Sequence, residues 1–211
     1  MESQDWDQRY DSAELVWGSE PNRWVRKECQ GLPPGRALDL AAGEGRNTLW
    51  LATLGWRVTA VDFSPVALER GRRLAERLPP VVAARVTFAE VDVRDYLPEP
   101  GGHDLVLIAY LHLFAEQRRT VLRRAAEALA PGGTLLVVGH DTTNLTEGSG
   151  GPADLAVLFT PDDILADLAD RRLRVVRAER VRRPAGAAHG ATAEAIDALV
   201  RLERPRGWSG P

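Results

Sequence analysis

The fold is decided by residues 38–48, which read LDLAAGEGRNT. A strand-like apolar run at residues 36–40 leads into this stretch, and a helix-like segment at residues 46–54 follows it. A strand that turns through glycines into a helix lets the backbone approach a ligand closely, at the edge of the sheet where open α/β folds bind ligands. Gly43 and Gly45 alone are weak evidence, because many strand-to-helix turns contain glycines for steric reasons.

Strand-like and helix-like segments alternate outward from this turn, which indicates an α/β fold with a mostly parallel, seven-stranded sheet and helices on both faces. We expect strands at residues 36–40, 56–61, 86–90, 104–109, 134–139, 173–181 and 195–202. We expect helices at residues 46–54, 64–78 and 116–130, the last ended by Pro131-Gly132-Gly133, a further helix opened by Thr160, and a loop at residues 141–151. The turn at residues 184–192 is too short for a parallel crossover, so the last two strands should be antiparallel neighbours.

The length of 211 residues suits one domain. We divide it into an N-terminal cover at residues 1–34, a core at 35–204 and a loose tail at 205–211. The aromatic-rich, amphipathic segment at residues 6–27 is expected to form a helical cover over the C-terminal edge of the sheet.

Scarce residue types exclude several chemistries. Lys27 is the only lysine and Cys29 the only cysteine, so a catalytic Schiff base, a P-loop, an internal disulfide, a cysteine zinc site and an iron-sulfur cluster are all excluded. The acidic N-terminus has no apolar signal region, and no apolar run is long enough to span a bilayer. We therefore expect a cytoplasmic protein without a membrane partner.

The charge balance argues against a nucleic-acid partner, because the formal net charge is -3. Arginines do crowd between Arg171 and Arg183, but they alternate with apolar residues, as on the solvated face of a strand.

Two further carboxylates are spaced for an adenosine cofactor. Asp62 lies 62 - 43 = 19 residues after Gly43, at the end of the second expected strand, and Asp92 follows the third. Either residue alone could be a solvated charge, but the glycine turn, Asp62 and Asp92 in this order favour a bound adenosine. A dinucleotide site would want a third glycine where Thr48 stands. Asp39 suits a cofactor with a positively charged amino group and sulfonium, or else it stabilises the turn.

This run resembles motif I of the class I S-adenosylmethionine-dependent methyltransferases, Asp/Glu-x-Gly-x-Gly-x-Gly, with Ala41 in place of the first glycine. Asp62, the pair Asp92-Val93, Asp104 and Pro131-Gly132-Gly133 match later landmarks of that family in order, and the antiparallel last strand is its hallmark. Residues 17–22, WGSEPN, and 45–49, GRNTL, are similar to the small-molecule branch that contains the tellurite-resistance and thiopurine methyltransferases.

The resemblance implies a set of residues around S-adenosylmethionine. Asp62 would hold the ribose, Phe63 would pack on the adenine, and Asp92 with the amide of Val93 would read the adenine edge. The motif I residues would lie along the methionine part, and Ala109 would border the cofactor from the fourth strand. The motif I residues in this set are Asp39, Ala41, Gly43, Gly45 and Asn47.

Histidines are the candidates for a general base. His112 and His140 follow the fourth and fifth strands, where both imidazoles would lie over one pocket. The resemblance adds His189, but Gly190 stands where the tellurite-resistance relatives carry arginine, so an anion-steering role is in doubt. Each histidine could instead be a structural imidazole.

Aromatic residues near the N-terminus could close the acceptor site. Tyr10, Trp17 and Trp24 would either pack the cover helix or form a lid that excludes water, and both roles can hold together. Tyr110 would also line the acceptor pocket.

The sequence therefore predicts direct methyl transfer to a small-molecule acceptor. The motifs of amino-methylating DNA and glutamine enzymes and the nucleophilic cysteine of cytosine methylation are missing. Arsenite methylation needs several thiolates, and we expect no metal because only Asp141 is placed to bind one. Two alternatives remain: a non-catalytic cofactor-binding subunit that acts through a partner, and a nicotinamide-dependent reductase. The acceptor and the oligomeric state are left open.

Overall fold

The computed structural model describes residues 20–185 and 193–207. It contains a seven-stranded sheet in the order β3-β2-β1-β4-β5-β7-β6. The strands are β1 (Arg36–Leu40), β2 (Arg57–Asp62), β3 (Val86–Glu90), β4 (His103–Ala109), β5 (Leu129–His140), β6 (Arg174–Pro184) and β7 (Glu194–Glu203). β7 runs antiparallel to both β5 and β6, and the other pairings are parallel. The predicted mostly parallel sheet with an antiparallel last strand is confirmed.

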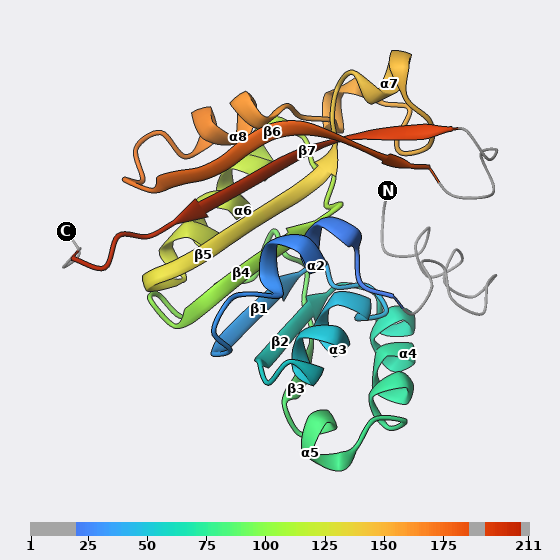
Figure 1. Cartoon of the computed structure of the whole chain (residues 1–211), viewed down its shortest axis with the longest axis vertical. Coiled ribbons are helices and arrows are strands. Elements are labelled where there is room, and N and C mark those ends of the chain that lie inside the picture. Colours follow the sequence, from blue (N-terminus) through green and yellow to red (C-terminus); the bar gives the residue numbers. More distant parts are fainter. Residues whose placement is uncertain (1–19, 186–192, 208–211) are drawn as a thin grey trace.

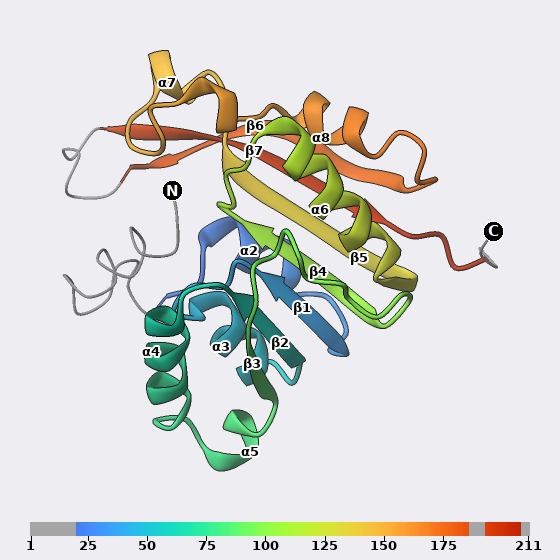
Figure 2. The same ribbon diagram turned by 180° about the vertical axis from the view of Figure 1, so that it is seen from behind.

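Helices cover both faces of this sheet (Figures 1 and 2). The helices are α2 (Arg23–Cys29), α3 (Arg46–Thr53), α4 (Pro65–Ala75), α5 (Pro80–Ala83), α6 (Ala115–Glu127), α7 (Asn144–Glu147) and α8 (Pro161–Asp167), with a 3₁₀ turn at Leu155–Val157. Side chains of β4 alternate between the two faces, as in a sheet covered on both sides. Leu105 and Leu107 pack under α2 and α3, whereas Val106 and Ile108 pack under α6 and α8.

The expected helix starts are present. The Ser64 hydroxyl accepts a hydrogen bond from the amide of Ala67 and caps α4. Thr160 and Asp163 form a reciprocal capping box at α8. Each cap satisfies backbone amides that have no partner within the helix.

Pro131-Gly132-Gly133 does not end a helix directly, which corrects the expectation for this segment. α6 ends at Glu127 and β5 begins at Leu129, so the three residues lie inside the strand. The β4–β5 register shifts between His103 and Leu105, and Gly132 takes a left-handed φ of 84°. The glycine provides a conformation that other residues avoid, so the segment forms a bulge rather than a helix stop.

Two smaller expectations also change. The helix after Ser64 ends at Ala75, and a short helix, α5, follows it. The expected loop at residues 141–151 contains α7.

The expected cover at residues 6–27 lies mostly outside the described residues, so its place over the C-terminal edge stays a prediction. Its described end includes most of α2, which packs Val25 and Cys29 on a face of the sheet.

Candidate functional site

The turn after β1 has an unusual backbone. Ala41, Gly43 and Gly45 all lie in the left-handed region, with φ of 61°, 56° and 79°. Glycine takes this conformation freely, but alanine does so at a cost of about 1–2 kcal/mol. The alanine in motif I therefore strains its own backbone. Gly45 caps α3 without a side chain, so the first amides of that helix receive no side-chain cap at this edge of the sheet.

Asp39 is a buried carboxylate beneath this turn. It is 1% exposed, and its Oδ2 accepts a hydrogen bond of 2.6 Å from the Thr48 hydroxyl. Burial raises the pKa of Asp39 to about 7, the Thr48 hydrogen bond opposes the rise, and the nearby charge of Asp62 adds to it. A positive charge placed beside Asp39 would restore its ionised form.

Asp62 ties the turn to β2. Its Oδ2 accepts a hydrogen bond of 2.7 Å from the amide of Gly43, and its Oδ1 accepts one of 2.9 Å from the amide of Ser64. The carboxylate is therefore fixed at the point where the sequence predicts a ribose ligand. The ribose role itself stays a prediction.

Asp92 has a partner that the sequence analysis missed. The Arg94 guanidinium donates to both carboxylate oxygens, with Nη2 2.6 Å from Oδ2, and this contact holds the pKa of Asp92 below its usual range. Val93 is buried, whereas Phe63 and Ala109 are partly exposed. An adenine would have to share Asp92 with Arg94.

The two predicted imidazoles lie together. His112 and His140 stack with ring centroids 5.5 Å apart and an interplanar angle of 21°. Burial lowers the pKa of each to about 4; His140 adds to the effect at His112, and Arg183 adds to it at His140. Both rings are therefore neutral at pH 7 and can accept a proton.

Two glycines give these rings room. A Cβ on Gly139 would lie 2.6 Å from the Phe159 ring and 3.4 Å from His112. A Cβ on Gly151 would lie 2.7 Å from the His140 ring. The distances of 2.6 Å to Phe159 and 2.7 Å to His140 are shorter than a side-chain carbon tolerates. Glycine at both positions therefore lets the backbone approach these rings closely.

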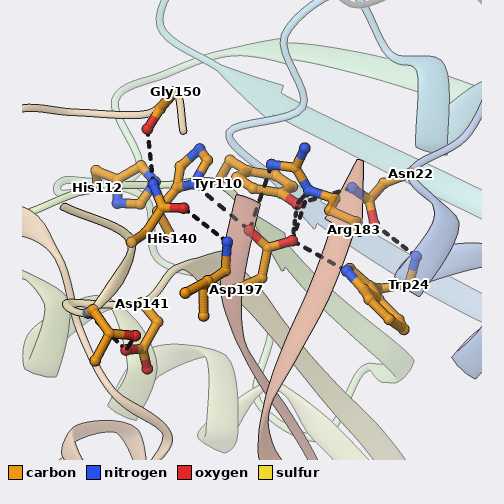
Figure 3. Close-up of polar contacts among 12 residues, drawn as sticks. Asn22, Trp24, Tyr110, His112, His140, Asp141, Gly150, Arg183 and Asp197 are labelled. Carbon is orange, nitrogen blue, oxygen red and sulfur yellow. Dashed lines mark hydrogen bonds and ion pairs between the residues drawn. The ribbon is translucent and has the colours of Figure 1, made fainter. Parts of the chain in front are cut away.

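Asp197 on β7 is a buried carboxylate that accepts hydrogen bonds from several residues of the site (Figure 3). The Tyr110 hydroxyl donates to its Oδ2 over 2.7 Å, Arg183 Nε donates over 2.7 Å, and Trp24 Nε1 donates over 3.1 Å. Tyr110 itself has a strained φ of 60° directly after β4. The sequence analysis predicted Tyr110 and Trp24 as pocket residues but missed Asp197 and Arg183.

Asn22 connects this cluster to motif I. Its backbone N–H donates to Asn47 Oδ1 over 2.9 Å, and its side-chain Nδ2 donates to the Tyr110 hydroxyl over 3.2 Å. Its Oδ1 accepts from the amides of Trp24 and Val25 and caps α2. Asn47, a predicted cofactor residue, is thus held in place by Asn22.

The remaining candidates are distributed as follows. Trp24 is 8% exposed and belongs to the core under α2. His189, Tyr10 and Trp17 lie outside the described residues. Within residues 20–185 and 193–207, no group of three or more His, Cys, Asp or Glu side chains could hold a metal ion. No helix in the same ranges is long and apolar enough to cross a membrane.

Comparisons with known proteins give both a family match and curated relatives. Residues 37–133 match the model of a methyltransferase domain. The demethylmenaquinone methyltransferase of Clavibacter sepedonicus is 36% identical over 107 residues, which cover 51% of this chain and 42% of that protein. The ribosomal RNA small subunit methyltransferase J of Alkalilimnicola ehrlichii is 43% identical over 75 residues, covering 33% and 28% respectively. The chain thus spans less than half the length of either relative.

Solved structures share the whole fold. The 1,6-didemethyltoxoflavin-N1-methyltransferase of Burkholderia thailandensis, with bound 1,6-didemethyltoxoflavin and S-adenosylhomocysteine, superposes with a TM-score of 0.68 at 24% identity, over 96% of this chain and 87% of that one. TehB from Haemophilus influenzae superposes with a TM-score of 0.69 at 16% identity, over 96% and 67%. At these identities the likeness shows the fold.

Proposed function

We propose that the chain is a class I methyltransferase that transfers a methyl group from S-adenosylmethionine directly to a small-molecule acceptor; its sheet order and the match of residues 37–133 to a methyltransferase domain support this. The observation that carries this proposal is the turn after β1, with the carboxylates of Asp39 and Asp62 fixed around its left-handed backbone. We treat residues 35–204 as one catalytic core, with residues 1–34 as a cover and 205–211 as a tail.

The chemistry of the turn fits this cofactor. Asp62 offers a fixed carboxylate for the ribose hydroxyls, and Gly43 and Gly45 have no side chains that could crowd the methionine part beside the start of α3. Asp39 offers a buried carboxylate that a cationic amino or sulfonium group would keep ionised. Phe63 and Asp92 would contact the adenine. When bound, the cofactor supplies a methyl group on a positively charged sulfur, which an acceptor atom can displace in line.

The other side of the site offers proton acceptors. His112 and His140 are neutral side chains at the ends of β4 and β5. Methyl transfer depends mainly on aligning the two reactants and excluding water, and a base is needed only when the acceptor must lose a proton. Either imidazole is chemically able to remove that proton, and Tyr110 would border the acceptor.

Binding and single-turnover measurements test the proposal. Calorimetry should detect S-adenosylhomocysteine but not NADH. Labelled S-adenosylmethionine should then methylate at least one member of a panel of phenols, thiols and chalcogen oxyanions, with a 16S ribosomal RNA transcript as the competing substrate. His112→Ala or His140→Ala should lower turnover while leaving cofactor affinity nearly unchanged.

Each alternative has its own outcome. Binding of NADH alone would favour a nicotinamide-dependent reductase and would overturn the assignment. Binding of S-adenosylhomocysteine without methylation of any acceptor would favour a cofactor-binding subunit that acts through a partner. Methylation of the RNA alone would replace the small-molecule acceptor.

A further inference from the structure

Asp197 is a fully buried carboxylate in the middle of an apolar run on β7. A buried charge is costly unless it is paired and hydrogen-bonded. Here Tyr110, Arg183 and Trp24 all donate to one oxygen, Oδ2. The other oxygen, Oδ1, accepts one long hydrogen bond from the described residues, of 3.4 Å from Arg183 Nη2. The carboxylate is thus held through Oδ2, and Oδ1 has capacity for another donor.

Oδ1 faces His140 (Figure 3). The distance between Oδ1 and His140 Nδ1 is 3.6 Å, and Nδ1 is buried without a hydrogen-bond partner among the described residues. The His140 side chain keeps 11% of its surface exposed. Because Nδ1 faces the carboxylate, Nε2 is the nitrogen of this ring that remains for a ligand.

In His112 it is Nδ1 that has a hydrogen-bond partner and Nε2 that is buried. Its Nδ1 lies 3.2 Å from the carbonyl oxygen of Val157, which requires the proton on Nδ1. Its Nε2 is buried without a partner. His112 therefore has a lone pair that solvent does not reach, and its ring stacks on that of His140.

We propose that Asp197 is a positioning residue that holds His140 with the proton on Nδ1 and leaves Nε2 free to accept a proton from the methyl acceptor. The inference rests on the proposed function. As the acceptor atom forms its bond to the methyl carbon, the carbon–sulfur bond breaks with its electron pair going to sulfur, and the acceptor's proton passes to His140 Nε2. His140 later returns this proton to water. Hydrogen bonds of this kind are often long without ligands and shorten in the reacting complex.

The surrounding charges define what Asp197 can do. Arg183 from β6 neutralises the carboxylate and disfavours a proton on His140, while Tyr110 and His112 face the same ring after β4. Asp197 therefore acts on the tautomer and orientation of His140 rather than by making it a strong base. Asn22 extends the hydrogen bonds of Asp197 and Tyr110 to Asn47 in motif I, so Asp197 is connected to the turn after β1.

Asparagine at Asp197 tests this role, because its amide group has the same shape but lacks the charge that selects the Nδ1–H tautomer. Asp167→Asn is the matched control: Asp167 is 2% exposed and pairs with Arg118 and Arg119 away from His140. The imidazole ¹⁵N shifts of the full-length protein report the tautomer directly, with His140 assigned by its absence in His140→Asn. The chain has four histidines, so the spectrum is simple.

The expected result separates positioning from folding. Asp197→Asn should mix the two tautomers of His140 and lower kcat at least about tenfold, a part of the roughly 100- to 10,000-fold effect of a general base. KM and S-adenosylhomocysteine affinity should stay within about twofold of wild type. Asp167→Asn should lose stability without either change. The tautomer of His140 in the wild-type protein is read without any variant, which preserves the test if Asp197→Asn does not fold.

Contrary outcomes are distinct. A wild-type His140 with its proton on Nε2 would overturn the positioning role. An unchanged tautomer in Asp197→Asn, with kcat no lower than in Asp167→Asn, would overturn it as well. Failure of the wild-type protein to methylate any acceptor while binding S-adenosylhomocysteine would instead overturn the proposed function, and the tautomer would still be read from the spectrum.

Discussion

Replacing Asp39 with asparagine is expected to stabilise the ligand-free protein at alkaline pH. Burial raises the pKa of Asp39 from 3.8 to about 7. Between these values the native state holds a proton that the unfolded state has released, so the free energy of unfolding falls as pH rises through this window. The contribution is fully present below pH 3.8 and is lost above about pH 7. The pKa difference corresponds to about 4 kcal/mol over the whole window.

Asparagine removes this dependence but keeps an oxygen for the Thr48 hydroxyl. Urea denaturation at pH 5 and pH 8 measures the effect. From pH 5 to pH 8 the wild-type protein should lose about 3 kcal/mol relative to Asp39→Asn, since most of the window lies in that range. Thr48→Val is a matched variant: loss of its hydrogen bond should raise the pKa of Asp39 further and move the decline to higher pH.

A cationic ligand should reverse the effect. A positive charge beside Asp39 favours the carboxylate, so binding of S-adenosylmethionine should release a proton and tighten as pH rises toward 8. Calorimetry in buffers of different ionisation enthalpy measures the proton release, and Asp39→Asn should abolish it. Unfolding curves of wild type and Asp39→Asn that keep a constant separation from pH 5 to pH 8 would refute the reasoning.

Three other predictions follow from the same contacts. Gly139→Ala should destabilise the protein by about 1–3 kcal/mol, because its Cβ would overlap the Phe159 ring; Gly31→Ala, which meets nothing within 4 Å, should change stability by less than about 0.5 kcal/mol in the same urea titration. Asp62→Ala should weaken cofactor binding by roughly 1–3 kcal/mol in calorimetry, and an unchanged affinity would show that the ribose assignment is misplaced. Cys29 is fully buried, and burial raises its pKa to about 12. The native protein should therefore not react with an aromatic disulfide reagent at pH 8, whereas the urea-unfolded chain should release one equivalent of the reagent's thiolate.

Local patterns were sufficient to predict the sheet. β1, the turn after it and the start of α3 are contiguous in sequence, and an apolar run, two glycines and a helix start predict them one after another. The antiparallel pair β6–β7 followed from the length of one turn. Pro131-Gly132-Gly133 was misplaced because the same residues favour both a helix stop and a bulge, and the pairing of β5 with β4 selects between them.

The Asp197 cluster could not be predicted in the same way. Asp197 meets Trp24 across 173 residues of sequence and Tyr110 across 87, so no local spacing records these contacts. One signal was present: Asp197 is a single carboxylate within the apolar run at residues 195–200. A charge at a position that must be buried needs a partner, and Arg183, at the end of the arginine-rich strand, is the partner that an interpretation of that strand as wholly solvated misses.

The charges of the site together constrain how a methyl group could be transferred. A neutral acceptor with an O–H or S–H group that takes a methyl group from a sulfonium gains its positive charge, which then leaves as a proton. Cys29 is buried at the end of α2 and Lys27 is exposed on the same helix, so neither can relay the methyl group or take the proton at the sheet edge. Asp197 is neutralised by Arg183, and His112 exposes no free nitrogen to solvent. Among Cys29, Lys27, Asp197 and the two stacked histidines, His140 is therefore the group that we propose as the proton acceptor, and its low pKa of about 4 suits an acceptor whose proton becomes acidic only as the methyl bond forms.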